Sequence, residues 1–168
     1  MQKVHRRTPV ISDSDLEVLY ERPGFMLRRA NQIGVSIFLE ETVIEGVTTT
    51  SQFGLMLILR ARPNMDQIGL AKLIGLDRST TGLVISKLET DGMLERKPGS
   101  TDRRKKELNL TEKGLAFLAR LEPKARRVEK RVLEAFDEPE ANEFLRLLRK
   151  FIEFHNSHVR IPMDRSLW

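Results

Sequence analysis

Hydrophobic residues in the middle of the chain recur at steps of three and four, which is the spacing of one face of an α-helix. Residues 67–74 carry one such stripe and residues 78–89 carry another. The stripes consist of Leu70, Ala71, Leu73 and Ile74, and of Thr81, Val84, Ile85 and Leu88. Asp66 and Asp77 directly precede the two stretches, where a short acceptor side chain can cap a helix. With Gly75 between them, the pattern predicts a helix-turn-helix.

The period changes beyond Gly92. Residues 93–97 read as a short strand, residues 98–103 as a turn, and residues 105–110 as a returning strand. The inward positions of the second strand are Leu108 and Leu110. The sequence therefore predicts a small β-hairpin directly after the helix-turn-helix.

Longer helical stripes flank this region on both sides. Pro23 suits the first turn of a long helix that ends at Gly46. After the hairpin, Thr111 can cap another long helix, in which we expect Pro123 to cause a kink or a break. Asp137 and a following proline mark the start of a further helix, which has a continuous apolar stripe.

A helix over residues 52–61 is predicted between these parts, because Thr49 to Gln52 form a capping box and the helix is apolar on nearly every side. Such a helix should be buried on every side. The predicted fold is mainly α with a small β-wing, as a single domain over residues 1–168. It comprises a flexible arm (1–15), a winged helix-turn-helix (49–110) and dimerisation helices (16–46 and 111–157). We expect the last to pair with a second copy, because the small wing module cannot cover three long amphipathic helices.

The distribution of basic residues indicates what the predicted fold binds. The formal net charge is +5 with a pI near 9.7, and residues 96–106 alone contain six basic residues against one acidic residue. An isolated charge run is usually a solvated surface. Beside a helix-turn-helix it indicates contact with DNA phosphates, which supply most of the affinity of such proteins.

The second helix of a helix-turn-helix lies in the major groove with residues near its N-terminus facing the bases. Its predicted outward residues here are Arg78, Ser79, Thr80, Gly82, Leu83, Ser86 and Lys87. Leu83 would be unusual on a solvated face unless it meets a thymine methyl group. On the hairpin, Lys97 and Lys105 are further candidates for contact with DNA.

Catalytic and cofactor chemistry find little support. The chain has no cysteine, which excludes thiolate metal sites and thiol nucleophiles, and it has no G-x-S-x-G or glycine-rich phosphate loop. His155 and His158 lack a third ligand at the usual spacing, so we expect solvated histidines, no metal and no cofactor. Without a long apolar segment or a cleavable signal pattern, we expect a cytoplasmic protein that is not an enzyme.

Over residues 23–155 the chain resembles the MarR family of bacterial transcriptional regulators. The resemblance rests on LAKLIGLDRSTTGLVISKLETDGMLER and TDRRKKELNLTEKG, in that order and spacing. It implies that Arg104 enters the minor groove from the wing tip, with Asp102 orienting its guanidinium and Arg103 adding a phosphate contact. A narrow minor groove attracts arginine, so the chemistry is consistent with these roles.

The stretch ERPGFMLRRANQIGVSIFLEE further resembles family members that control the breakdown of aromatic acids. The likeness implies that a small aromatic acid, or its coenzyme A thioester, binds between the dimerisation helices and the reading head. Candidate contacts are Arg28, Arg29, Asn31, Gln32, Phe53, Met56 and Leu57. Intersubunit salt bridges are an equal alternative for the two arginines.

These observations favour a homodimeric winged-helix repressor that binds a near-palindromic operator of double-stranded DNA and releases it on binding the effector. Two alternatives remain at this point. One is a non-specific architectural DNA-binding protein, and the other is a winged-helix module whose basic hairpin binds an acidic protein.

Overall fold

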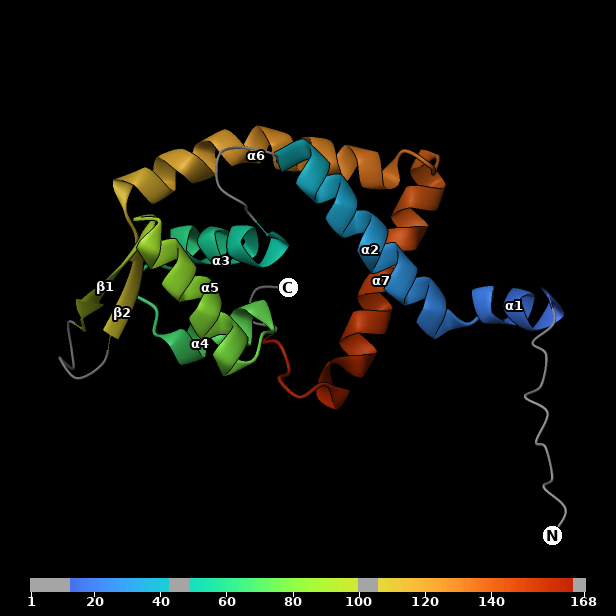
Figure 1. Ribbon diagram of the computed structural model, residues 1–168, viewed down its shortest axis with the longest axis horizontal. Helices are drawn as coiled ribbons and strands as arrows, with labels where there is room; N and C mark the ends of the chain where they lie inside the picture. Colours follow the sequence, from blue (N-terminus) through green and yellow to red (C-terminus); the bar gives the residue numbers. More distant parts are fainter. Residues whose placement is uncertain (1–12, 43–48, 100–105, 165–168) are drawn as a thin grey trace, which may run out of the picture. The chain divides into compact units, whose positions relative to one another are not determined.

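The computed structural model describes residues 13–42, 49–99 and 106–164 (Figure 1). The elements in chain order are α1 (Asp13–Tyr20), α2 (Pro23–Thr42), α3 (Thr50–Ala61), α4 (Gln67–Ile74), α5 (Arg78–Thr90), β1 (Leu94–Pro98), β2 (Lys106–Leu110), α6 (Glu112–Leu133), α7 (Glu138–His155) and the 3₁₀ helix η1 (Asn156–His158). This order confirms the predicted class, mainly helical with a small β-wing. The chain forms two compact units, which divide between Ser36 and Ile37.

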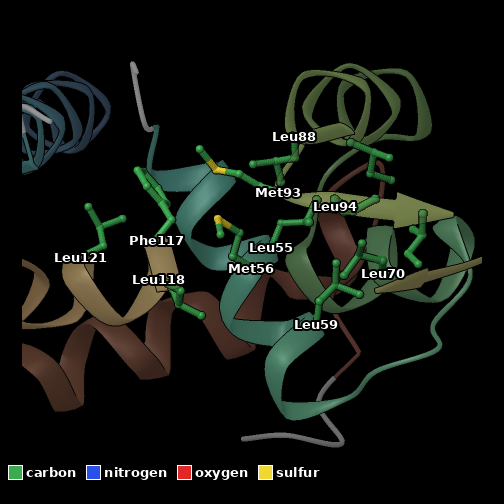
Figure 2. Packing of buried hydrophobic residues seen from close by; sticks show 12 residues of the cluster. Leu55, Met56, Leu59, Leu70, Leu88, Met93, Leu94, Phe117, Leu118 and Leu121 are labelled. Atoms are coloured by element: carbon green, nitrogen blue, oxygen red, sulfur yellow. The ribbon is translucent and has the colours of Figure 1, made fainter. Parts of the chain in front are cut away.

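Helix α3 lies at the centre of the second unit and packs against α4, α5, α6 and β2. A capping box begins it, in which the Gln52 amide donates to Thr49 Oγ1 at 3.1 Å and the Thr49 amide donates to Gln52 Oε1 at 2.8 Å. Leu55, Met56 and Leu59 are completely buried (Figure 2). The remaining apolar residues of the helix, Phe53, Leu57 and Ile58, are only partly buried against the core. The expectation of burial on every side is therefore correct for one face and too strong for the other.

The helix-turn-helix forms as its capping residues predict. Asp66 Oδ1 accepts the Gly69 amide at 2.7 Å, and Asp77 Oδ1 accepts the Thr80 amide at 2.9 Å. Between the two helices Gly75 has a φ of 72°, in the left-handed region where a side chain is disfavoured. Local side-chain chemistry thus sets both helix starts and the turn.

The wing is a two-stranded antiparallel sheet in which Leu94 pairs with Leu110 and Pro98 pairs with Lys106. Leu108 is buried, as predicted for an inward position, and Leu110 packs partly buried against the same core. The Leu108 amide also donates to the Met65 carbonyl at 2.8 Å, which joins the sheet to the segment before α4. The wing is therefore fastened to the helix-turn-helix by backbone pairing as well as by packing.

Of the two outcomes expected at Pro123, a kink or a break, the break is wrong, because helix α6 runs from Glu112 to Leu133 without interruption. Proline removes one backbone donor, which leaves the carbonyl four residues earlier, that of Ala119, without its helical partner. Both residues are exposed, so water can reach this carbonyl. The buried residues Leu118, Leu121 and Ala125 lie on either side of the proline and hold the helix on the core.

Helix α7 begins with a second capping box, in which the Glu140 amide donates to Asp137 Oδ1 at 2.9 Å. It has no buried residue, although its sequence is strongly amphipathic. After it, residues 156–164 turn back toward the helix-turn-helix, and the Asp164 amide donates to the Lys72 carbonyl at 3.0 Å. We call residues 156–164 the C-terminal hook.

The end of β2 and the start of α6 fit closely around Met93. The Thr111 amide donates to the Met93 carbonyl at 3.1 Å, and Thr111 Oγ1 donates to the Gly92 carbonyl at 2.7 Å. A Cβ atom at Gly114 would lie 2.1 Å from the Met93 carbonyl oxygen. Only glycine therefore allows the first turn of α6 to approach the backbone of Met93, directly before β1, this closely.

Replacing Gly114 with alanine should lower the free energy of unfolding by on the order of 1–3 kcal/mol, because the backbone must shift to admit the methyl group. Gly24→Ala is the matched control, since among the described residues nothing lies within 4 Å of a Cβ atom at Gly24. Urea denaturation followed by circular dichroism measures both variants. Equal stability of Gly114→Ala and the unmodified protein would contradict this packing.

Candidate nucleic-acid interface

One face of α5 is buried and the opposite face is open. Thr81, Ile85 and Leu88 are buried, whereas Leu83 is 73% exposed. The other predicted outward residues are either exposed (Arg78, Ser79, Ser86, Lys87) or partly exposed (Thr80, Gly82). One face of α5 thus fixes the helix on the core, and the other face carries a long donor, hydroxyl groups and an apolar side chain. This is the layout of a helix that contacts bases in the major groove.

Asp77 organises the first turn of this helix. Its carboxylate accepts the Ser79 hydroxyl at 2.5 Å, the Thr80 hydroxyl at 2.7 Å and the Thr80 amide at 2.9 Å. These hydrogen bonds, that of the Ser79 hydroxyl first, hold the pKa of Asp77 well below its ordinary value. Because both hydroxyls donate to Asp77, their oxygen lone pairs remain available to accept from outside. The amino groups of adenine and cytosine are donors of the kind that such oxygens can bind.

Gln67 also belongs to this surface, although no sequence pattern predicts a role for it. Its Nε2 donates to the Arg78 carbonyl at 3.2 Å, and a Cβ atom at Gly82 would lie 3.2 Å from the same nitrogen. A cleft of about 520 Å³ opens here, lined by Gln67, Asp77, Arg78, Ser79 and Gly82 together with Arg160 and Ile161 of the C-terminal hook. The small residue at position 82 thus lets α4 and α5 approach at the edge of the reading face.

The basic residues around α5 differ in their partners. Lys87 Nζ lies 2.8 Å from Asp91 Oδ1, and Lys97 Nζ lies 2.6 Å from Glu95 Oε1. Within the described part of the chain, the guanidinium of Arg78 makes neither an ion pair nor a hydrogen bond. Exposed ion pairs contribute little to stability, so both lysines can exchange their carboxylates for phosphates at small cost.

The predicted wing-tip contacts Asp102, Arg103, Arg104 and Lys105 lie outside the described residues. The strands that lead into and out of this turn are described as far as Pro98 and Lys106, which pair with one another.

Comparison with known proteins agrees with this geometry. The model of the MarR family matches residues 48–106, which span the helix-turn-helix and the wing. A transcriptional regulatory protein proposed for the hcr operon of Thauera aromatica is 30% identical over 152 residues, which cover 87% of this chain and 90% of the relative. The chain belongs to the MarR family.

Two solved structures add detail about its relatives. The transcriptional repressor CouR, bound to a 23-mer DNA duplex, is 30% identical with a TM-score of 0.74, and the match covers 83% of this chain and 99% of CouR. Bordetella bronchiseptica BpsR, whose DNA binding is regulated by 6-hydroxynicotinic acid, is 28% identical with a TM-score of 0.73, covering 79% of this chain and 94% of BpsR. This MarR-family chain is thus a DNA-binding transcriptional regulator with a winged-helix fold.

The candidate effector contacts lie in both compact units. In the first, Arg28 donates to Gln32 Oε1 at 3.0 Å and lies 4.7 Å from the centre of the Phe25 ring, while Arg29 and Asn31 are exposed. In the second, Phe53 and Leu57 are partly buried, and Met56 is completely buried in the core. Met56 is therefore a packing residue in this structure and not an open wall.

The described residues meet the requirements of neither a metal site nor a membrane-spanning helix. Residues 13–42, 49–99 and 106–164 contain no group of three side chains suited to hold a metal, and the rings of His155 and His158 lie 5.6 Å apart. None of the helices in these ranges combines the length and the apolar character needed to cross a membrane.

Replacing Asp77 with alanine should lower the melting temperature, because the Thr80 amide and two hydroxyls lose their acceptor. The pKa of Asp77 is lowered on folding, so its charge stabilises the protein above the ordinary value of 3.8 and this contribution is lost as the pH falls further. The difference between the unmodified protein and Asp77→Ala should accordingly shrink below pH 3.8. Thermal melts across this range test it.

Asp77→Asn is the control for the capping interaction alone, since asparagine also caps helices but carries no charge. A pH-independent difference between Asp77→Ala and the unmodified protein would contradict the role assigned to the carboxylate.

Proposed function

We propose that this MarR-family chain is a homodimeric repressor that binds a near-palindromic operator and releases it on binding a small aromatic acid or the coenzyme A thioester of one. The observation that carries the proposal is the outer face of α5, because the inner face of this helix is fixed in the core. Leu83 is exposed on the outer face, and Arg78 has no ion-pair partner there among the described residues. An unpaired guanidinium with five donors suits the paired acceptors of guanine, and Leu83 suits a thymine methyl group.

Exposed apolar surface supports the dimer. Helix α7 buries none of its residues within the single chain, and its large exposed hydrophobic residues are Phe144, Leu145, Leu147, Phe151 and Phe154. Helix α2 likewise exposes Met26, Leu27 and Ile33. Apolar surface of this extent usually marks an interface. A second copy related by two-fold symmetry would cover it and would present two reading helices to two half-sites.

The DNA-binding residues that we propose are those of α5 and the wing. Arg78, Ser79, Thr80, Gly82, Leu83, Ser86 and Lys87 would face the major groove, and Lys97, Asp102, Arg103, Arg104 and Lys105 would form the wing contact. Gln67 joins them through its hydrogen bond to the Arg78 carbonyl.

The effector contacts that we propose are Arg28, Arg29, Asn31 and Gln32 in the first unit, and Phe53 and Leu57 are the apolar candidates in the second. A carboxylate or phosphate would take its charge-assisted hydrogen bonds from the arginines. The guanidinium of Arg28 already contacts the Phe25 ring and donates a hydrogen bond to Gln32, so it is partly ordered before a ligand binds. The related BpsR, which responds to 6-hydroxynicotinic acid, supports an aromatic acid as the class of ligand.

Selection of duplexes from a random-sequence library by the unmodified protein should yield a motif with two-fold symmetry. Arg78→Ala should lose about 1–3 kcal/mol of discrimination at one base pair of each half-site, because a bidentate contact to a base edge is removed. Arg104→Ala should weaken binding to all duplexes alike, since a wing contact to the backbone and minor groove carries less sequence information. Fluorescence anisotropy on the selected duplex and on single-base variants measures both effects.

Arg126→Ala serves as the matched control, because Arg126 is an exposed arginine of α6 away from the reading face. Selection of no motif, together with equal weak binding to every duplex, would indicate an architectural DNA-binding protein and would contradict the repressor.

An aromatic acid that binds the folded protein should raise its melting temperature, by the equivalent of about 2.7 kcal/mol when the ligand is present at 100 times its dissociation constant. Benzoic, hydroxybenzoic, hydroxycinnamic and hydroxynicotinic acids and their available coenzyme A thioesters form the panel. Arg28→Ala and Arg29→Ala should reduce the shift, whereas Arg22→Ala, at an exposed arginine just before α2, should not. If both Arg28→Ala and Arg29→Ala keep the full shift, the proposed contacts are wrong.

A further inference from the structure

Three separate contacts fix the C-terminal hook, one within the hook itself and two between the hook and the helix-turn-helix. Asn156 closes the hook on itself, because its Nδ2 donates to the Met163 carbonyl at 3.0 Å and its Oδ1 accepts the Met163 amide at 2.9 Å. A Cβ atom at Gly75 would lie 2.6 Å from Met163 Cγ, so the absence of a side chain at Gly75 makes room for Met163. The hook therefore occupies a place that the turn leaves open for it.

The third contact satisfies a helix end. The last carbonyls of a helix lack intrahelical partners, and the Lys72 carbonyl in the last turn of α4 is one of them. The Asp164 amide donates to this carbonyl at 3.0 Å. Pro162 stiffens the segment between these anchors, because it fixes its own φ and favours an extended Ile161. The anchors and the proline together give the hook a defined position beside α4 and α5.

This position brings Arg160 to the reading head. Arg160 and Ile161 line the same cleft as Gln67, Arg78 and Ser79. Arg160 is exposed, and no carboxylate within the described ranges pairs with its guanidinium, as is also the case for Arg78. The carboxylate in this cleft, that of Asp77, is already engaged by Ser79 and Thr80. Two arginines without a counter-charge thus open onto one cleft, an arrangement that favours a polyanion.

We propose that the C-terminal hook is part of the DNA-binding surface, and that Arg160 contacts a backbone phosphate next to the bases read by α5. The proposal rests on the proposed function in one respect, namely that α5 reads DNA. It adds a phosphate contact from beyond α7, which neither the helix-turn-helix nor the wing provides. It also gives the hook a role in holding this arginine in register with Arg78.

The test uses the full-length protein and the duplex selected by the unmodified protein, with anisotropy titrations at several salt concentrations. Each phosphate contact contributes about 0.9 to the slope of log affinity against log salt. Arg160→Ala should therefore lower this slope by about one per subunit and weaken binding by about tenfold per subunit near 0.1 M salt. Arg160→Lys should restore the slope, since it keeps the charge. Arg126→Ala, at an exposed arginine outside the cleft, should change neither quantity.

Asn156→Ala provides an independent variant, because it removes both hydrogen bonds that close the hook without touching the cleft. It should weaken binding in the same direction as Arg160→Ala. The double variant should be little weaker than Arg160→Ala alone, because both substitutions remove the same contact. Thermal melts of each variant establish that the protein is folded.

Three results would overturn the proposal. Affinity and slope of Arg160→Ala equal to those of Arg126→Ala would show that the hook does not contact DNA. Tighter binding would show that the hook covers the reading face, and a loss that leaves the salt slope unchanged and is not restored by lysine would show a purely structural role. If the unmodified protein binds no duplex, the proposed function fails as well, whereas the three results above leave it intact.

Discussion

Burial of one face of α3 is the constraint on which the rest of the second unit depends. Leu55, Met56 and Leu59 are completely buried and lie among side chains from α4, α5, α6 and the wing. Each such side chain contributes on the order of 1.5–3 kcal/mol when it leaves water. Elements as short as α4 and the two strands could not persist in isolation. The position of the reading helix is therefore a consequence of packing on α3, and the functional residues occupy the faces that this packing leaves outside.

Local chemistry explains which parts of this arrangement could be predicted. A helix start is determined by one side chain and the amides within the next turn, so Asp66, Asp77, Thr49 and Asp137 could each be read from the sequence, and the structure confirms all four. The two wing strands could also be read from the sequence, since the period changes after Gly92, and the structure places them at Leu94–Pro98 and Lys106–Leu110. The wing-tip contacts rest on resemblance to the family and stay a prediction.

Tertiary contacts explain the errors and omissions. Proline lowers the stability of an isolated helix enough to break it, but α6 continues past Pro123 because the buried residues around the proline hold the helix on the core. The C-terminal hook has no periodic pattern, and its fit to Gly75 exists only once the turn has formed. Gln67 was missed for the same reason, since its partner is a backbone carbonyl in the next helix.

The distribution of ion pairs separates two tasks on the reading surface. Lys87 and Lys97 rest on neighbouring carboxylates, and these exposed pairs can exchange for phosphates without leaving a buried charge unpaired. Arg78 keeps no such partner within the described residues, so in the role that we propose its donors need not leave a carboxylate before they reach a base. The arginine that we propose to discriminate bases is thus available in the free chain, whereas the lysines that we propose to contact phosphates form weak, exposed ion pairs. This division suits the proposed function, because a protein that must find one site among many needs a general affinity that stays modest and responds to salt, together with residues that distinguish the bases.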